Sequence, residues 1–97
     1  MKIKNYTDYK VGLKTRGSRR IDSYNFEEYE HERVIEKITG YELLKLLTQY
    51  VNQDSFMSIE VKGNKVFLEL FNLSTCEDSS LEFEITELRG KGNGSNE

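Results

Sequence analysis

The second half of the chain contains three stretches in which apolar and polar residues alternate. They cover residues 57–61, 66–71 and 81–86, and a period of two is typical of β-strands with one buried side. The turn-like residues 62–65 join the first two stretches, and the polar residues 74–80 indicate a loop before the third. The pattern predicts a three-stranded meander with one apolar face, formed by Met57, Ile59, Val61, Val66, Leu68, Leu70, Leu81, Phe83 and Ile85.

Residues 39–53 have the spacing of an amphipathic helix. Thr39 and Glu42 are three positions apart, as in a capping box, and Ile38 and Leu43 are placed for a hydrophobic staple. The apolar residues that follow share one broad side of a helix, and they are Leu43, Leu44, Leu46, Leu47, Tyr50 and Val51. We expect this side to cover the apolar face of the meander.

The N-terminal part predicts one further strand. Tyr9, Val11 and Leu13 alternate with Lys and Gly residues, as in a strand with one buried side. The following residues 15–25 are polar and contain Gly, Ser, Asp and Asn, which are typical of loops.

Residues 26–38 are compatible with two structures. Their many Glu residues favour a helix capped at Asn25, whereas their apolar residues scatter around a helical wheel. Because the capping signal at Thr39 marks the start of a new helix, we favour a strand over at least residues 32–38.

Together these elements predict an α+β domain with two layers. One amphipathic helix packs on a mainly antiparallel sheet of about four to five strands, in the order β-β-α-β-β-β. A length of 97 residues suits a single compact domain, which we expect to span residues 1–89. The glycine-rich residues 90–97 contain no large apolar side chain, and we expect them to be disordered.

The composition favours a reducing, cytoplasmic setting. Cys76 is the single cysteine, so the chain cannot form an intramolecular disulfide. The N-terminus lacks the apolar core of a signal peptide, and no apolar run approaches the ~20 residues of a membrane span. We therefore expect no membrane partner.

Charge is distributed unevenly along the chain. Residues 1–20 carry seven Lys or Arg and one Asp, whereas the remaining 77 residues carry sixteen acidic and seven basic residues. Such asymmetry indicates electrostatic partners, but it also allows the two parts of the chain to attract each other.

The acidic part contains a candidate binding surface, which we call the acidic ridge. On a strand, alternation places its residues on one side. The row could imitate a nucleic-acid backbone or complement a basic protein surface. It could equally be a solvated face that protects a sheet edge. The acidic ridge consists of Glu28, Glu30, Glu32 and Glu36.

The basic part contains a second candidate surface, on the predicted loop 14–20. Its residues suit contacts with phosphates rather than base reading. They could also pair with the acidic ridge, and a pI near 5.3 argues against direct nucleic-acid binding. The candidates are Lys14, Arg16, Arg19 and Arg20.

Two aromatic residues are expected on the sheet face away from the helix. Phe67 and Phe71 alternate with the apolar row, and Phe56 is a candidate third member. Exposed aromatics beside acidic residues would suit a protein interface or a homodimer. Alternatively, the N-terminal strand and loop could fold over this face and bury it.

The sequence does not predict an enzyme. His31 is the only histidine and has no evident partner for acid–base work or metal binding. Cys76 lies beside two acidic residues, an environment that does not activate a thiol. We expect no catalytic residue, no metal site and no cofactor.

The acid-rich segments "EEYEHE" and "LEFEITE", with the small size and acidic charge, make the chain resemble small proteins of phages and mobile elements, in particular anti-CRISPR inhibitors. This resemblance implies a non-enzymatic inhibitor of a nucleic-acid-processing protein, in the cytoplasm of a bacterium or a phage-infected cell. The acidic ridge would contact basic residues of that partner, and Phe67 and Phe71 would provide an apolar anchor. The basic N-terminal segment departs from a uniformly acidic nucleic-acid mimic.

Two alternatives follow from the same residues. The chain could be a small nucleic-acid-binding accessory protein that uses Lys14, Arg16, Arg19 and Arg20. It could also be an assembly subunit, including a homodimer, that completes its core only with a partner.

Overall fold

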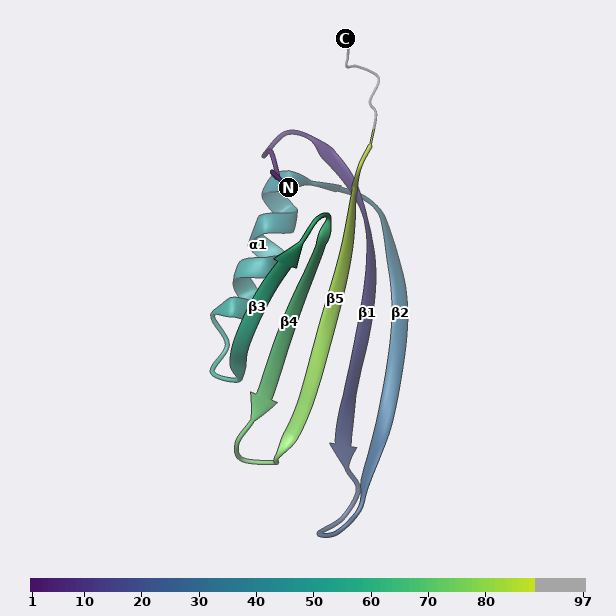
Figure 1. The fold of residues 1–97 in the computed structure, drawn as a ribbon, viewed down its shortest axis with the longest axis vertical. Helices are drawn as coiled ribbons and strands as arrows, with labels where there is room; N and C mark the ends of the chain where they lie inside the picture. The colour runs from purple at the N-terminus through teal and green to yellow at the C-terminus, as the bar shows by residue number, and fades with distance from the viewer. Residues whose placement is uncertain (89–97) are drawn as a thin grey trace.

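One helix packs on a five-stranded antiparallel sheet (Figure 1). The computed structural model describes residues 1–88, so the expected disorder of residues 90–97 lies outside the described residues. The α+β class and the order β-β-α-β-β-β predicted from the sequence are confirmed. The elements are β1 (Asp8–Arg20), β2 (Phe26–Thr39), α1 (Gly40–Val51), β3 (Phe56–Lys62), β4 (Lys65–Asn72) and β5 (Glu77–Glu87).

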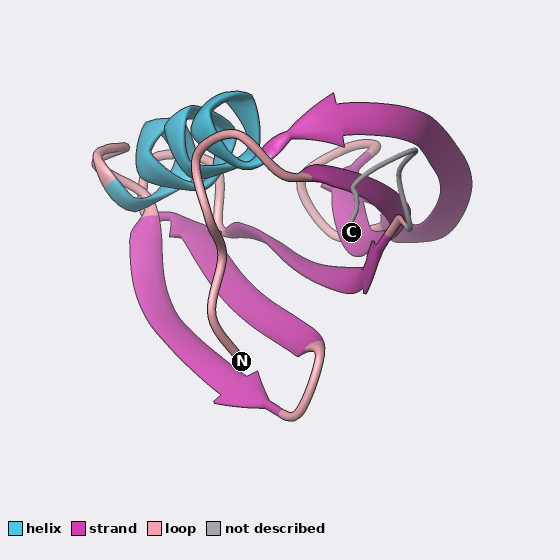
Figure 2. Cartoon of the chain, turned by 90° about the horizontal axis from the view of Figure 1, so that it is seen from above, coloured by secondary structure: helices cyan, strands magenta, loops and turns pink. Residues whose placement is uncertain are grey.

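The strands lie in the order β2-β1-β5-β4-β3. β1 and β5 form the centre, because the N-terminal hairpin and the C-terminal meander join along these two strands. β2 and β3 are therefore the two edges. The chain leaves one edge at the end of β2, and α1 carries it along one side of the sheet to the other edge (Figure 2).

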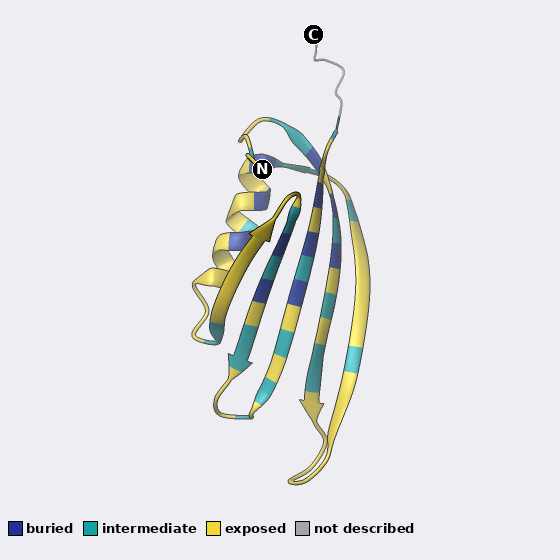
Figure 3. Cartoon of the chain, in the orientation of Figure 1, coloured by how far each residue is buried: buried dark blue, intermediate teal, exposed yellow. Residues whose placement is uncertain are grey.

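The core lies between α1 and one face of the sheet, which we call the helix-covered face. β1, β4 and β5 contribute alternate residues that the sequence pattern predicts, whereas the predicted Ile59 and Val61 of β3 are exposed. Figure 3 shows buried positions gathered on α1 and on β1, β5 and β4. The helix contributes Leu43 and Leu47, whereas Leu44 and Val51 remain exposed on its flank. The buried apolar residues are Tyr9, Val11, Leu13, Leu43, Leu47, Val66, Leu68, Leu81, Phe83 and Ile85.

The predicted capping box fixes the start of α1. The Thr39 hydroxyl accepts a hydrogen bond from the Glu42 amide at 3.2 Å, and the Glu42 carboxylate accepts one from the Thr39 amide at 3.4 Å. The next two amides donate to the N-terminal segment, Gly40 to Thr7 at 2.9 Å and Tyr41 to Asn5 at 3.0 Å. These bonds satisfy amides that have no partner within the helix.

β1 and β2 are longer than predicted. Residues 15–20 continue β1 instead of forming a loop, so the prediction of a basic loop 14–20 is wrong. Residues 26–39 form a strand along their whole length, which resolves the helix or strand alternative in favour of the strand. This half of the hairpin has no apolar alternation, and its cross-strand pairs are polar or aromatic. The Arg19 guanidinium, for example, lies 5.3 Å from the centre of the Tyr29 ring.

β5 also begins earlier than predicted. Residues 77–80 belong to the strand and pair with β4, although the polar sequence 74–80 indicated a loop. Ser79 and Ser80 pair on their other side with β1. Because both neighbours supply ladder hydrogen bonds, these residues join the sheet without apolar alternation.

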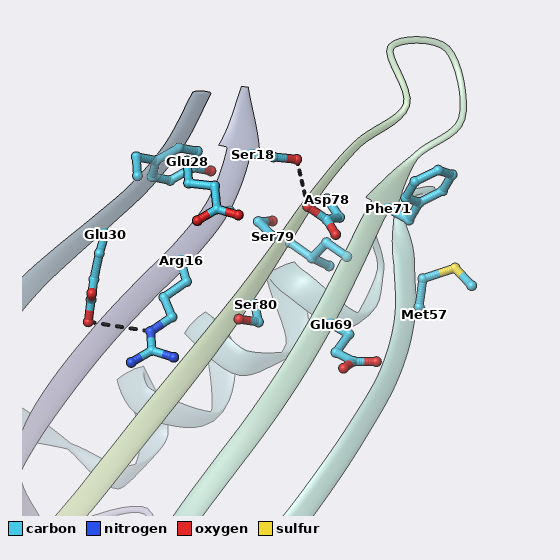
Figure 4. A pocket seen from close by; sticks show the side chains of 13 residues that line it. Arg16, Ser18, Glu28, Glu30, Met57, Glu69, Phe71, Asp78, Ser79 and Ser80 are labelled. Carbon is cyan, nitrogen blue, oxygen red and sulfur yellow. Dashed lines mark hydrogen bonds and ion pairs between the residues drawn. The ribbon is translucent and has the colours of Figure 1, made fainter. Parts of the chain in front are cut away.

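A β-bulge moves Met57 out of the predicted apolar row. Phe56 lies opposite Leu70 and Ser58 lies opposite Glu69, so β3 has one extra residue, Met57, between the two pairs. An extra residue shifts the alternation of the bulged strand. Figure 4 shows Met57 beside Phe71 on the side of the sheet away from α1.

Candidate protein-binding face

The face of the sheet opposite α1 carries almost all the residues singled out in the sequence. On β1 its members alternate with the buried Tyr9, Val11 and Leu13, so they point away from the helix. Figure 4 shows this face toward the viewer with α1 behind it. We call it the open face, since each residue described on it is exposed or half-buried.

Three rows of charge run along the open face. The basic row on β1 contains Lys10, Lys14, Arg16 and Arg20, and the acidic ridge occupies the neighbouring β2. β5 borders β1 on its other side and carries a second acidic row, formed by Asp78, Glu82 and Glu84. The basic row therefore lies between two acidic rows, in which seven carboxylates surround four cations.

The basic and acidic blocks of the sequence pair across the β1–β2 hairpin. The Arg16 Nε lies 3.4 Å from a Glu30 carboxylate oxygen, and the Lys10 Nζ lies 3.9 Å from one of Glu36. Lys14 stands between Glu32 and Glu82 in the strand register. Both ion pairs are solvent-exposed, so each contributes at most about 1 kcal/mol to stability.

β5 is linked to β1 by further polar contacts. The Ser18 hydroxyl donates to the Asp78 carboxylate at 2.8 Å, and the Arg20 amide donates to the Glu77 carboxylate at 2.7 Å. Lys65 of β4 lies 3.5 Å from the Glu82 carboxylate on the far side of β5. These contacts fix the second acidic row in place relative to the basic row.

An open cavity of about 920 Å³ lies over one end of this face (Figure 4). Carboxylates of β2, β4 and β5 line it, together with the paired Arg16 and the apolar side chains Met57 and Phe71. A second cavity of about 350 Å³ adjoins it, because both are lined by Arg16, Glu69 and Ser80. The lining carboxylates of the larger cavity are Glu28, Glu30, Glu69 and Asp78.

Three of the apolar side chains that border these cavities lie on the open face, and they form what we call the apolar strip. Phe71 and Met57 line the larger cavity, and Phe67 lines the smaller one. Phe67 and Phe71 are half-buried, and Met57 is exposed. The expected third aromatic was wrong, because Phe56 packs against the core on the other side of the sheet.

The alternative in which the N-terminal strand folds over Phe67 and Phe71 is also wrong. β1 is a central strand of the sheet and does not form a separate layer. Its basic residues divide between the two faces, since Arg19 alternates with Arg20 and stacks over Tyr29 on the helix-covered face. Lys14, Arg16 and Arg20 share the open face with the acidic ridge.

Sequence reasoning missed the second acidic row and the apolar contribution of Met57. The alternating acids around Phe83 placed Glu82 and Glu84 on one side of a strand, but only the strand order makes β5 the neighbour of β1. No local sequence pattern indicated that Met57 lies on the open face, because a β-bulge depends on pairing with the neighbouring strand.

The β1–β2 hairpin ends in an ordered turn at residues 21–25. The Asp22 carboxylate accepts hydrogen bonds from the amides of Tyr24 and Asn25, both at 2.9 Å, and from the Asn25 side chain at 2.9 Å. The Asn25 side-chain bond is the largest of the effects that lower the pKa of Asp22 below its ordinary value.

The structure places the two other reactive residues apart from this face. His31 alternates with the acidic ridge, and its ring centre lies 5.5 Å from that of Tyr29. Cys76 is exposed in the turn between β4 and β5. Within residues 1–88, no group of three or more His, Cys, Asp or Glu residues is arranged to hold a metal ion. No helix within this described part of the chain is long and apolar enough to cross a membrane.

Comparisons with protein-family models, with curated proteins and with solved structures gave no match.

Proposed function

We propose that this protein is a non-enzymatic inhibitor that binds a nucleic-acid-processing protein through its open face. The proposed setting is the cytoplasm of a bacterium or a phage-infected cell, as for anti-CRISPR inhibitors. The observation that carries the proposal is the arrangement of the three charge rows, in which seven carboxylates surround four cations on one exposed face. Such a face carries a net charge of −3 along the three rows and complements a basic protein surface.

The two acidic rows favour a partner that normally holds nucleic acid. One strand separates them, so they lie about 10 Å apart at the usual strand spacing. The two backbones that border a groove of DNA also present parallel rows of negative charge, separated by roughly 6 to 12 Å. A protein groove that neutralises phosphates with Lys and Arg would therefore find a similar pattern on the open face.

The apolar strip would supply binding energy that charge complementarity alone does not provide. Charge complementarity mainly accelerates association and selects partners, whereas aromatic residues often dominate binding energy. Phe67 and Phe71 lie on β4, one strand beyond the second acidic row, and Met57 lies beside Phe71. Contact with all three would bury apolar surface next to the charge pairs.

Direct nucleic-acid binding by the basic row is less favourable. A phosphate that approaches Arg16 meets the Glu30 carboxylate, which already lies 3.4 Å from the guanidinium. Lys14 is likewise bordered by a glutamate on each neighbouring strand. Repulsion from these carboxylates opposes the phosphate contacts on which non-specific binding depends.

The proposal is tested with a panel of purified RNA-guided nucleases of the Cas9 type. Guided DNA cleavage is measured with and without the protein, and complex formation is followed by size-exclusion chromatography. We expect inhibition of at least one nuclease together with a stable complex. Failure to bind or inhibit any member of the panel would contradict the proposal.

Fluorescence anisotropy of labelled DNA and RNA, at low and physiological salt, distinguishes the nucleic-acid alternative. We expect no binding at physiological salt. Salt-sensitive binding that is lost in the Arg16→Ala/Arg19→Ala/Arg20→Ala variant would support the accessory-protein function instead.

A further inference from the structure

The sheet has an edge at β3, on which the apolar side chains of Met57, Ile59 and Val61 are exposed. Within residues 1–88, β4 is the only strand that pairs with β3. Figure 1 shows β3 at the end of the sheet, and Figure 3 shows it exposed along most of its length. Ile59 and Val61 belong to the apolar row of the helix-covered face, yet they are 46% and 57% exposed.

The opposite edge, β2, is protected against strand pairing. Half of its fourteen residues are charged, and a bulge interrupts its pairing with β1 between Tyr9 and Val11. Charged side chains and bulges are devices that keep an edge from pairing with another chain. β3 has only Glu60 and Lys62 as charged residues, and they form an ion pair of 3.7 Å with each other.

We propose that β3 is a dimerisation edge, on which β3 of a second copy of this chain adds in antiparallel orientation. The register that places apolar residues opposite apolar residues is centred on Glu60. In that register Ile59 of each copy lies opposite Val61 of the other, and both pairs lie on the helix-covered side. Cross-strand pairs of β-branched residues stabilise a sheet.

Charge also fits this register. The two Glu60 carboxylates lie opposite each other on the open face, which alone would be unfavourable. Lys62 of each copy lies diagonally across from Glu60 of the other, and its ammonium already lies 3.7 Å from its own Glu60. The four groups together carry no net charge, so the seam holds two carboxylates and two ammonium groups.

Other registers are poorer. Centring on Ile59 places Val61 opposite the bulged Met57, whereas centring on Val61 brings Gly63 into the ladder. Gly63 has a φ of 59° and belongs to the turn after β3. The Glu60-centred register uses residues 58–62, which follow the bulge and pair regularly with β4.

The pairing has a consequence for the open face. Its two-fold axis is perpendicular to the sheet, so the two sheets become one sheet of ten strands with both open faces on the same side. A dimer would then present two acidic faces and two apolar strips to one partner, and bivalent binding raises apparent affinity. This consequence, unlike the dimer itself, rests on the function proposed above.

The dimer is tested by sedimentation velocity of the full chain over a range of micromolar concentrations, without any partner. Val61→Lys and Val34→Lys are matched variants, because the two valines are 57% and 52% exposed on opposite edges. We expect the unmodified chain and Val34→Lys to dimerise with Kd values within about twofold of each other. Val61→Lys should raise Kd by roughly tenfold or more, because it places a lysine on the apolar, helix-covered side of the seam.

A monomer at all concentrations would overturn the proposal, as would a dimer that Val61→Lys does not weaken. A dimer that Val34→Lys weakens instead would place the interface at β2. Circular dichroism shows whether each variant remains folded, and failure of the nuclease panel would not affect this result.

The register is tested by oxidation of single cysteines in a Cys76→Asn background. Asn suits the left-handed φ of 57° at that position. Residues opposite each other in antiparallel strands have Cα atoms about 4.5–5.5 Å apart, within the range of a disulfide. Glu60→Cys should therefore cross-link to itself, whereas Ile59→Cys should cross-link to Val61→Cys only when the two proteins are mixed. Self-linking at 59 or 61 in preference to 60 would overturn the register.

Discussion

The two faces of this sheet are built on opposite principles. The helix-covered face packs apolar residues of β1, β4 and β5 against Leu43 and Leu47, and these ten residues are buried. The open face shares the same strands and register, but it carries rows of charge and half-buried aromatics. Burial of apolar area dominates folding energy, whereas exposed ion pairs contribute little. One face therefore holds the fold together, whereas the other remains exposed to solvent.

The largest difference between the faces is expected for two phenylalanines. Phe83 is fully buried on the helix-covered face, whereas Phe67 is half-buried on the open face. Phe83→Ala should lower the free energy of unfolding by about 3–5 kcal/mol, through lost burial and a cavity. Phe67→Ala should lower it by about 1 kcal/mol or less. Urea denaturation measures both, and equal losses would contradict the division of roles.

The packing of α1 on the helix-covered face depends on the hydrogen bonds at the start of the helix. Thr39→Ala removes the capping bond to the Glu42 amide and should cost about 1 kcal/mol in the free energy of unfolding. Thr48→Ala is the control, because the Thr48 hydroxyl donates its hydrogen bond to the Leu44 carbonyl within the helix and caps no helix end. We expect it to be nearly neutral or stabilising in thermal unfolding, since Ala is the better helix former. A larger loss for Thr48→Ala would argue against the cap.

The ion pairs of the open face should matter much less for stability. A double-mutant cycle with Arg16→Ala and Glu30→Ala should give a coupling free energy of about 0.2–1 kcal/mol, reduced by added salt. Chemical denaturation at low and high salt measures it. A coupling well above this range, or one insensitive to salt, would mean that the open face stabilises the fold.

The smallest expected effect concerns the turn at the end of the charge rows. The pKa of Asp22 is lowered mainly by the Asn25 side chain, so its contribution to turn stability is complete at neutral pH. That contribution is lost as the pH falls through the lowered pKa. Carbon-detected NMR titration of the Asp22 carboxyl group should show a pKa below the ordinary value, and Asn25→Ala should raise it. An unchanged pKa in Asn25→Ala would contradict the assigned cause.

The sequence predicted the helix-covered face well, because period-two and period-3.6 apolar patterns report burial directly. The helix start at Thr39 and the strand residues Leu81, Phe83 and Ile85 follow from such local signals. Residues 15–20 of β1 were predicted as a loop, because residues such as Arg16 and Arg20 are held in the strand by partners on neighbouring strands and not by an apolar pattern. A sequence pattern does not reveal partners that lie on another strand.

The candidate site was predicted only in part for the same reason. The acidic ridge and Phe67 and Phe71 alternate locally, so their side of the strand was readable. The second acidic row required the knowledge that β5 lies next to β1. The position of Met57 could be known only from the β-bulge between the Phe56–Leu70 and Ser58–Glu69 pairs. Both depend on contacts between segments far apart in the chain.

A charge reversal on each face, measured as binding to a nuclease that the unmodified protein inhibits, tests most directly whether the open face is the docking surface. Glu28→Lys/Glu30→Lys changes the open face, and Glu27→Lys/Glu87→Lys makes the same change in net charge on the helix-covered side, where both glutamates are exposed. We expect the first pair to abolish binding and inhibition, and the second to leave both nearly unchanged. Equal loss in the two pairs, or binding that survives the first, would contradict the assignment of the open face as the docking surface.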